Sequence, residues 1–279
     1  MMAVILRTDG LNKVYRLGSF GRSREIRALN NININVESDK PVIIAVVGES
    51  GSGKTTLAKT LLRLVEPSSG TATIYDQVVA GRGVRLPKRA FLGAVQPIFQ
   101  NPFEAFSRYR PVEAYLHETA ERVAGLDKAA AFVAVEQALA AVGLEYHDVR
   151  NKYSNQFSGG ELQRVSIARA LIPDPKLIIA DEPVSMIDAS RRMIIINLFL
   201  KLKEEARRSF LYITHDLATA YYISDYVVVM NKGAVVEFGA ARDVMSNPQH
   251  DYTKLLLDSI PTTTKKWRPP KAIQERAPA

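Results

Sequence analysis

The chain has 279 residues, of which 47% are hydrophobic and 24% are charged, the balance of an ordinary soluble protein that can bury a large core. It contains no cysteine, which excludes disulfides, thiolate metal sites and cysteine-ligated iron–sulfur clusters and suits a reducing compartment. Its first residues show no signal-peptide pattern, and no segment approaches the roughly 20 apolar residues of a membrane-spanning helix. We therefore expect a chain that does not cross a membrane by itself.

The net charge of +8 is unevenly distributed. The Pro-rich tail at residues 261–279 carries five basic residues against one acidic residue, so it holds half of the excess and is predicted to be disordered. The charge that remains on the folded part fits nucleotide phosphates or anionic lipid as well as nucleic acid. We expect no nucleic-acid partner.

Residues 1–40 alternate apolar and polar residues, as in AVILRTD and NININVES, which predicts antiparallel strands. Between these segments lies a Gly- and Arg-rich stretch, residues 16–27. This stretch is either a solvated hairpin or a contact with lipid head groups or a partner protein.

From residue 42 the pattern changes to short, unbroken apolar runs. Runs without alternation are typical of strands covered on both faces, so they predict a parallel sheet flanked by helices. The runs are residues 42–48, 177–181, 210–214 and 226–230. The first three end in residues suited to chemistry, and α/β sheets bind their ligands at the carboxyl ends of strands.

Residues 103–156 lack such runs and show helical periodicity, which predicts a helical subdomain inserted into the sheet domain. A further apolar run, MIIINLFL at residues 193–200, is predicted to form the buried face of a helix. The predicted fold class is therefore α/β, with an antiparallel β part and a helical insertion.

The sequence GESGSGKT, residues 48–55, matches the pattern G-x-x-x-x-G-K-[ST] between a predicted strand and a predicted helix. Its glycines allow backbone N–H groups to surround phosphate oxygens at a helix start. Lys54 is predicted to reach the β- and γ-phosphates, and Thr55 to offer its hydroxyl to Mg²⁺. The predicted phosphate-binding residues are Gly48, Glu49, Ser50, Gly51, Ser52, Gly53, Lys54, Thr55 and Thr56.

The apolar run LIIAD ends in Asp181 and is followed by a second carboxylate, Glu182. Asp181 is predicted to hold Mg²⁺, and Glu182 to polarise the attacking water. An acidic pair after a strand can also be an ordinary loop start. The phosphate loop upstream favours the catalytic interpretation.

Three further residues complete the predicted site. His215 follows the run at 210–214 and is predicted to contact the γ-phosphate. Gln100 ends the segment AVQPIFQ and can reach Mg²⁺ or the attacking water, whereas Tyr15 either stacks on a purine ring or belongs to the core. The other histidines, predicted to be surface or packing residues, are His117, His147 and His250.

A second helix start suited to an anion lies at Ser158-Gly159-Gly160, where Ser158 resembles an N-cap. If this start lies a subdomain away from Gly48, one chain cannot close both ends on one nucleotide. Two chains arranged head to tail could do so. Glu161, in the first turn of this helix, belongs to the same predicted contact.

The motifs resemble those of the ATP-binding cassette (ABC) ATPases, in the order of that family: GESGSGKT as Walker A, IFQNP as the Q-loop, FSGGELQR as the signature, LIIADEP as Walker B, SMID as the D-loop and ITHD as the switch histidine. The resemblance covers residues 1–260. It implies a P-loop NTPase with a RecA-like core at 41–102 and 157–246, an antiparallel β subdomain at 1–40 and a helical subdomain at 103–156.

The same resemblance implies ATP and Mg²⁺ as cofactors. It further implies a dimer with two ATP molecules, each held between one chain's Walker A loop and the other chain's signature. Asp188 of the D-loop is then expected beside the nucleotide.

Within this family, NPFEAF, RYRPV, the Arg-rich stretch and above all NPQHDYTKLLL, within 247–260, resemble the ATPase subunits that drive uptake of oligopeptides and dipeptides. That subgroup also includes importers of nickel and of oligosaccharides. The resemblance implies two transmembrane permease subunits, a second ATPase that is identical or a paralogue, and an extracytoplasmic solute-binding protein. It implies a peripheral position on the cytoplasmic face of the membrane, where Phe103 and Phe106 either contact a permease helix or form core.

The sequence departs from the family pattern at four places. The signature begins with Phe157 instead of Leu and has Glu161 where Gln is usual. The D-loop has Met186-Ile187 before its aspartate, and Asp251 replaces the usual Pro of the C-terminal motif. None of these changes removes a catalytic group.

Two other functions are compatible with a phosphate loop. A soluble cassette ATPase that acts on nucleic acid or the ribosome would use the positive charge, but the single cassette without a long heptad-patterned insertion is against it. A P-loop kinase would transfer phosphate to a small molecule, but it would have no use for the second helix start at Ser158-Gly159-Gly160.

Overall fold

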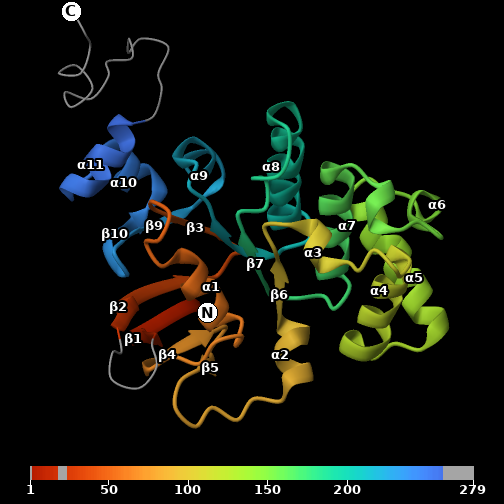
Figure 1. Ribbon diagram of the computed structural model, residues 1–279, viewed down its shortest axis with the longest axis horizontal. Helices are drawn as coiled ribbons and strands as arrows, with labels where there is room; N and C mark the ends of the chain where they lie inside the picture. The colour runs from red at the N-terminus through yellow and green to blue at the C-terminus, as the bar shows by residue number, and fades with distance from the viewer. Residues whose placement is uncertain (1, 18–23, 260–279) are drawn as a thin grey trace, which may run out of the picture.

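The computed structural model describes residues 2–17 and 24–259 (Figure 1). The predicted disordered tail and the middle of the Arg-rich stretch lie outside the described residues. The strands are β1 (Ala3–Leu17), β2 (Arg24–Ser38), β3 (Ile43–Val47), β4 (Ser69–Ile74), β5 (Gln77–Ala80), β6 (Val95–Ile98), β7 (Leu177–Asp181), β8 (Ser209–Ile213), β9 (Tyr226–Asn231) and β10 (Ala234–Ala240). The helices are α1 (Lys54–Leu61), α2 (Lys88–Ala94), α3 (Pro102–Ala105), α4 (Val112–Thr119), α5 (Lys128–Ala141), α6 (Tyr146–Val149), α7 (Gly159–Leu171), α8 (Ala189–Glu204), α9 (Leu217–Ile223), α10 (Ala241–Ser246) and α11 (Asp251–Asp258), with a π-helical turn at Ala120–Ala124 and a 3-10 turn at Ser154–Gln156.

The unbroken apolar runs form one six-stranded sheet in the order β10-β9-β3-β8-β7-β6. β3 is parallel to both β8 and β9, and β7 is parallel to β6 and β8. Only β10 is antiparallel, as the partner of β9 in a hairpin. The predicted parallel sheet is confirmed, and its parallel strands bring their carboxyl ends to a single edge.

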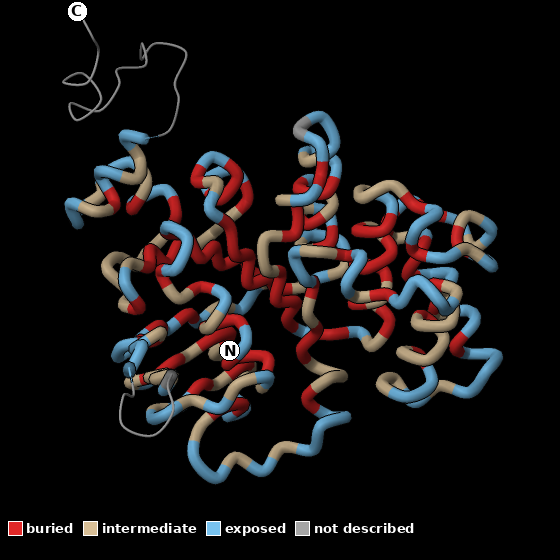
Figure 2. The backbone as a smooth tube through the Cα atoms, viewed as in Figure 1, coloured by how far each residue is buried: buried red, intermediate tan, exposed pale blue. Residues whose placement is uncertain are grey.

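The side chains of these strands alternate between the two faces of the sheet, as the period of two in a strand requires. Ile178 and Ala180 of β7 contact the core that contains the helices, whereas Leu177 and Ile179 contact the core shared with the second sheet. Figure 2 shows the central strands as almost continuously buried. Burial on both faces explains why the runs do not alternate apolar and polar residues, and it holds the strand ends in place.

The second sheet is antiparallel, in the order β2-β1-β4-β5. It contains the predicted strands of residues 1–40, but it also contains β4 and β5, which the sequence interpretation assigned to the core. This boundary was wrong because the hairpin turn is Tyr75-Asp76, which has no glycine although both residues have positive φ, 46° and 61°. The usual Asn-Gly or Asp-Gly signal is therefore absent.

Residues 103–156 form helices, as predicted, and these pack with α7 around one apolar cluster. Phe106 is core, only 2% exposed, with its ring edge-on to Tyr115 at a centroid distance of 5.4 Å. Phe103 is 43% exposed. The two phenylalanines, which the sequence treated alike, therefore differ: one packs and the other faces outward.

The run at 193–200 lies in α8 and is buried on one side only. Ile195, Ile196 and Phe199 are buried, whereas Met193 and Ile194 are about half exposed. The run spans more than two helical turns, so its apolar residues cannot all face one core. The prediction of a buried face was correct for part of the run.

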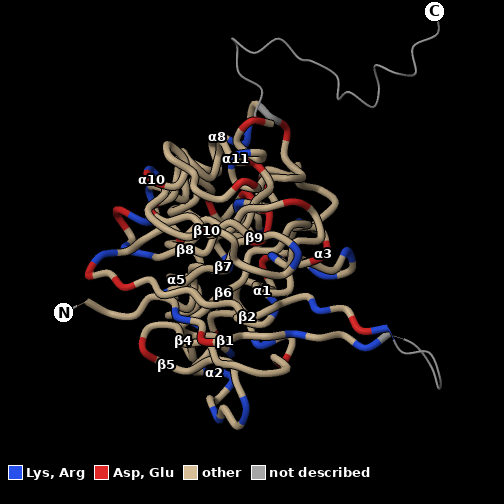
Figure 3. The backbone as a smooth tube through the Cα atoms, turned by 90° about the vertical axis from the view of Figure 1, so that its left-hand side faces the viewer, with Lys and Arg blue, Asp and Glu red and all other residues tan. Residues whose placement is uncertain are grey.

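Among the described residues, no helix is long and apolar enough to cross a membrane. In Figure 3, blue Lys and Arg and red Asp and Glu are scattered over a backbone that is mostly tan. One basic run covers the exposed loop before α2 and the start of α2, with Arg82, Arg85, Lys88 and Arg89. The positive charge of the described residues therefore does not gather on one broad face.

The aromatic packing beneath the parallel sheet predicts a large stability effect. Phe199 is fully buried and contacts Phe210 and Tyr212 of β8, with ring centroids 5.2 and 5.8 Å away. We expect Phe199→Ala to lower the free energy of unfolding by about 3–5 kcal/mol, because it removes buried apolar surface and leaves a cavity. Urea denaturation measures this. Val133→Ala on the exposed side of α5 is the control; an equal loss there would contradict the packing argument.

Candidate functional site

The loop from Gly48 to Gly53 joins β3 to α1 and requires glycine at both ends. Gly48 has φ of 146°, and a Cβ there would lie 2.1 Å from the Met230 carbonyl oxygen. Gly53 has φ of 107°, and its Cβ would lie 2.5 Å from the Ala28 carbonyl oxygen. Neighbouring backbone therefore approaches so closely that no side chain fits. The N-terminus of α1 follows at once, with its free N–H groups at the loop.

Lys54, the first residue of α1, is buried with its ammonium group inside the loop. Its Nζ donates hydrogen bonds to the carbonyl oxygens of Gly48 at 2.7 Å and Glu49 at 2.8 Å. Burial lowers the pKa of Lys54, although the carboxylates of Glu182 and Asp181 act in the opposite direction. The loop thus surrounds a partly desolvated positive charge, which attracts an anion.

Asp181 and Glu182 stand where β7 ends, beside this charge. The Thr55 hydroxyl donates to Asp181 at 3.5 Å. Burial raises the pKa of Asp181, while the Thr55 hydroxyl lowers it. Hydroxyl and carboxylate oxygens are the ligands that Mg²⁺ prefers, so this pair suits a magnesium ion.

Glu182 has a positive φ of 47°, which is uncommon for a residue with a side chain. Its N–H donates to the Ile213 carbonyl oxygen of β8 at 2.9 Å, and this bond fixes the turn. Gln100 Nε2 donates to the Glu182 carboxylate at 3.1 Å, and His215 Nδ1 lies 3.3 Å from the same oxygen. Three neighbouring strands, β6, β7 and β8, therefore deliver the three predicted residues to one point.

The phosphate-loop hollow encloses about 360 Å³. It is lined by Ile26, Arg27, Ala28, Ser50, Gly51, Gly53, Lys54, Thr55, Thr56, Glu182, Lys232 and Gly233. Ser52 Oγ is buried beside it without a hydrogen-bond partner among the described residues. The donors and cations outnumber the single carboxylate, so the hollow suits a chain of phosphate groups.

Two contributors to this hollow were missed by sequence reasoning. Arg27 comes from β2, and Lys232 with Gly233 comes from the turn between β9 and β10. The Gly233 N–H donates to the Ser52 carbonyl oxygen at 2.9 Å, so the turn also holds the loop. No local motif marks these residues, because only the sheet topology brings them together.

Tyr15 does not line the hollow. Its half-buried ring lies under Lys13 Nζ, 5.1 Å away.

The second predicted helix start is capped by its own chain. Ser158 is the N-cap of α7, and its Oγ accepts from the Glu161 N–H at 3.3 Å. The Glu161 carboxylate accepts in return from the Ser158 N–H at 2.9 Å and from its hydroxyl at 2.7 Å. These bonds to Ser158 lower the pKa of Glu161. The pattern is a complete capping box.

The signature hollow, of about 220 Å³, lies at this helix start. It is lined by Ser158, Gly160, Glu161, Arg164, Arg191, Ile194 and Ile195. It shares no residue with the phosphate-loop hollow, and in Figure 1 α1 and α7 lie on opposite sides of β7. Of the other predicted residues, Gly159 packs against the Met186 backbone and Asp188 is exposed at the start of α8.

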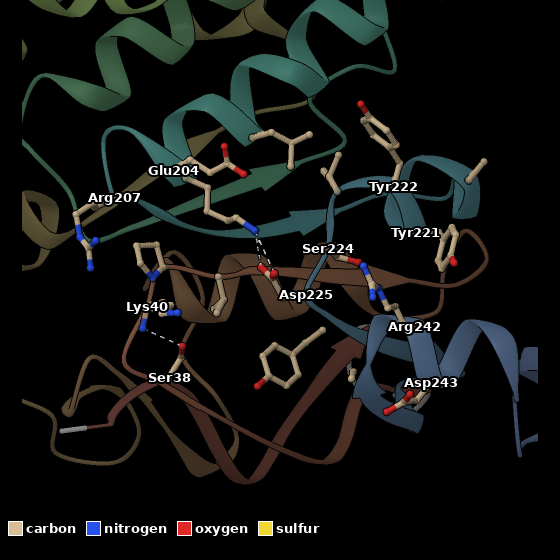
Figure 4. A pocket seen from close by; sticks show the side chains of 18 residues that line it. Ser38, Lys40, Glu204, Arg207, Tyr221, Tyr222, Ser224, Asp225, Arg242 and Asp243 are labelled. Carbon is tan, nitrogen blue, oxygen red and sulfur yellow. Dashed lines mark hydrogen bonds and ion pairs between the residues drawn. The ribbon is translucent and has the colours of Figure 1, made fainter.

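The largest hollow described, about 1160 Å³, lies elsewhere (Figure 4). It is open at the amino ends of β3 and β9, where Lys203 pairs with Asp225 at 3.1 Å. None of the predicted site residues lines it.

Two of the remaining histidines have structural contacts: His117 with the Tyr146 hydroxyl, and His250 with the Tyr252 N–H. His147 lies between two carboxylates in α6.

A glycine loop around a lysine, with two carboxylates, a glutamine and a histidine at one sheet edge, defines a nucleoside triphosphatase of the phosphate-loop class. Residues 29–185 match the family described as ABC transporter, and residues 236–279 match the one described as oligopeptide/dipeptide transporter, C-terminal region. The chain belongs to the ABC transporter family, as an ATP-binding and ATP-hydrolysing member.

Similar proteins agree with this assignment. The di/tripeptide transport ATP-binding protein DppF of Pseudomonas aeruginosa is 35% identical over 262 residues, which are 93% of this chain and 80% of that protein. The oligopeptide transport ATP-binding protein OppD of Mycobacterium tuberculosis is 36% identical over 263 residues, 93% of this chain and 42% of that protein. The solved ATP-binding cassette MJ0796, a dimer bound to ADP and Pi, has the same fold, with a TM-score of 0.72, 24% identity, and coverage of 85% of this chain and 99% of that chain.

The close backbone approach at Gly53 predicts a specific loss of binding. In Gly53→Ala the new methyl group meets the Ala28 carbonyl and the residue must keep a positive φ, so the loop deforms. We expect ATP affinity, measured by fluorescence titration, to fall by about tenfold or more. The control is Gly93→Ala in α2, where a Cβ meets nothing within 4 Å. Unchanged ATP binding by Gly53→Ala would contradict this view of the loop.

Proposed function

We propose that the chain is the ATP-hydrolysing subunit of an importer that takes up oligopeptides or dipeptides. The observation that carries this proposal is the pairing of a complete nucleotide site with the C-terminal region, residues 236–279, that matches the oligopeptide/dipeptide transporter family. Both named relatives are peptide-transport ATP-binding proteins, and each aligns with 93% of this chain. Importers of oligosaccharides or nickel belong to the same subgroup and are the alternative.

In this proposal the phosphate loop, residues 48–56, holds the triphosphate of ATP. Thr55, Asp181 and Gln100 would hold Mg²⁺, which would offset the negative charge of the phosphates. Thr55 and Asp181 already lie within hydrogen-bond distance of each other. Tyr15 stacks on the purine ring from β1, a role that its half-exposed ring permits.

Glu182 is proposed as the general base that orients the attacking water and accepts its proton. Gln100 and His215 both contact one oxygen of its carboxylate, which gives the carboxylate a fixed direction. Lys54 and His215 supply positive or hydrogen-bonding groups beside the transferred phosphoryl group, where negative charge develops. Each group acts from the end of a different rigid element, which limits its motion.

The two separate hollows support a two-chain site. Ser158, Gly159, Gly160 and Glu161 do not line the phosphate-loop hollow of their own chain, and in Figure 1 α1 and α7 lie on opposite sides of β7. We propose that they close the site of a second ATPase, identical or a paralogue. Asp188, exposed at the start of α8, contacts the same site across the dimer.

The membrane part of the transporter is proposed to be two permease subunits, supplied with solute by an extracytoplasmic binding protein. The chain would then sit on the cytoplasmic face of the membrane. Exposed Phe103, beside Gln100 at the junction with the helical segment, is the proposed permease contact. Copurification of the tagged chain from membranes, with identification of its companions and uptake of labelled peptides, tests this; companions that import only nickel or oligosaccharide would overturn the peptide assignment.

Replacing the proposed base separates binding from hydrolysis. In Glu182→Gln the amide keeps a similar shape but cannot accept the proton of water, so we expect ATP to bind while turnover falls by about 100-fold or more. A closed, ATP-dependent dimer should then accumulate in size-exclusion chromatography. Glu136→Gln, on exposed α5, is the matched control. Turnover at the parent's rate would exclude Glu182 as the base.

A bulky residue at the signature tests the shared site. Ser158→Arg should leave ATP binding by the same chain's loop unchanged, because the signature hollow is separate, but it should abolish turnover that needs a second chain. Ser158→Thr keeps the N-cap hydroxyl and serves as the control. Equilibrium ATP binding and steady-state phosphate release measure the two effects. Full turnover by Ser158→Arg would contradict the dimer mechanism.

A further inference from the structure

The start of α11 is fastened to β10 by one carboxylate. Glu237 accepts hydrogen bonds from the Gln249 N–H at 2.8 Å and the His250 N–H at 3.1 Å. His250 Nδ1 then accepts from the Tyr252 N–H at 3.1 Å, which caps the helix. Although burial raises it, the pKa of Glu237 lies below its usual value because of these donors. The position of Tyr252 is therefore set by the hydrogen bonds that Glu237 and His250 accept at the start of α11.

The apolar side of α11 packs against a cluster that includes residues of β3, the strand that leads into the phosphate loop. Tyr252, Leu256 and Leu257 contact a buried cluster formed by β3, β9, α9 and α10. One member of the cluster is Val47, the residue directly before Gly48. The last described helix of the chain is thus part of the wall behind the loop.

The Tyr252 hydroxyl touches the loop itself. It accepts a hydrogen bond from the Glu49 N–H at 3.0 Å, across 203 positions of sequence. Burial raises the pKa of the Tyr252 phenol, so the ring stays neutral. The other end of the same peptide group is the Gly48 carbonyl, which accepts from Lys54 Nζ at 2.7 Å.

A peptide group is planar, so its N–H and C=O turn together. Any rotation that broke the bond to Tyr252 would also move the Gly48 oxygen away from Lys54. The opposite end of the loop is held by Gly233, through the Ser52 carbonyl. The loop therefore has one anchor at each end, and Tyr252 is the anchor nearest the lysine.

We propose that Tyr252 is a positioning residue for ATP binding: through the Gly48-Glu49 peptide it keeps the phosphate loop and Lys54 in the conformation that receives the phosphates. This inference rests on the proposed role of the loop and extends it to the C-terminal region. It gives that region a function in the nucleotide site, where Asp251 opens the helix that carries the tyrosine.

The test is Tyr252→Phe in the full chain, which removes one hydroxyl and keeps the ring in its cluster. In the nucleotide-free protein, the amide hydrogen of Glu49 should exchange about threefold to tenfold faster. This factor corresponds to the free energy of one neutral hydrogen bond. ATP affinity, titrated with EDTA to prevent turnover, should fall by a similar factor of about threefold to tenfold. Turnover at saturating ATP should change less than the KM.

The matched control is Tyr222→Phe, which removes a hydroxyl bonded to Asn197 at 3.2 Å on the α8–α9 surface. It should alter neither quantity. Glu237→Ala, which releases the start of α11, should also weaken ATP binding, but it should add little in the Tyr252→Phe background because both act through the same contact.

Unchanged ATP affinity in Tyr252→Phe, or an equal change in Tyr222→Phe, would overturn the proposal. Full additivity of Glu237→Ala and Tyr252→Phe would overturn the route through α11. A parent chain that bound no ATP would overturn the proposed function as well, so the two failures are distinguishable.

Discussion

The site depends on one constraint, the close approach of backbone at the end of β3. The phosphate loop that follows β3 meets the backbone of β9 at one end and the backbone of β2 at the other. β3 lies between β8 and β9 with both faces buried, so its carboxyl end can move little. The chain leaves it at Gly48, against the Met230 carbonyl, and returns at Gly53, against the Ala28 carbonyl. Because the neighbouring strands are parallel, the same packing brings Glu182 and His215 to the edge where the loop begins.

This geometry places opposite charges in a region with little solvent. Burial lowers the pKa of Lys54 and raises that of Asp181, so both groups are less favourable in their charged forms than at the surface. A polyanion beside Lys54 and a cation beside Asp181 would each offset this cost. The site is therefore electrostatically matched to a metal-bound polyphosphate, whereas a neutral ligand would leave the cost in place.

The sequence was informative wherever a feature depends on neighbours along the chain. Strand burial, the glycine loop and the N-cap at Ser158 all follow from local patterns, and the motif order identified the family. It was not informative for contacts between distant segments. The β4–β5 hairpin was missed because Tyr75-Asp76 carries no turn signal, and the contact of Tyr252 with Glu49 depends on how α11 docks. The exposed half of the run at 193–200 was likewise decided by packing.

The signature shows how one substitution can be absorbed. Glu161, where the family usually has Gln, accepts from both the N–H and the hydroxyl of Ser158, which an uncharged amide oxygen would do more weakly. A carboxylate is also favoured in the first turn of a helix by the positive end of the helix dipole. Its charge lies in a hollow that Arg164 and Arg191 also line, so the two cations offset it. The departure therefore strengthens the cap of α7, and the charges that line the hollow still sum to a positive value. The helix start is ordered within one chain, as the proposed contact with the phosphate of a second chain requires.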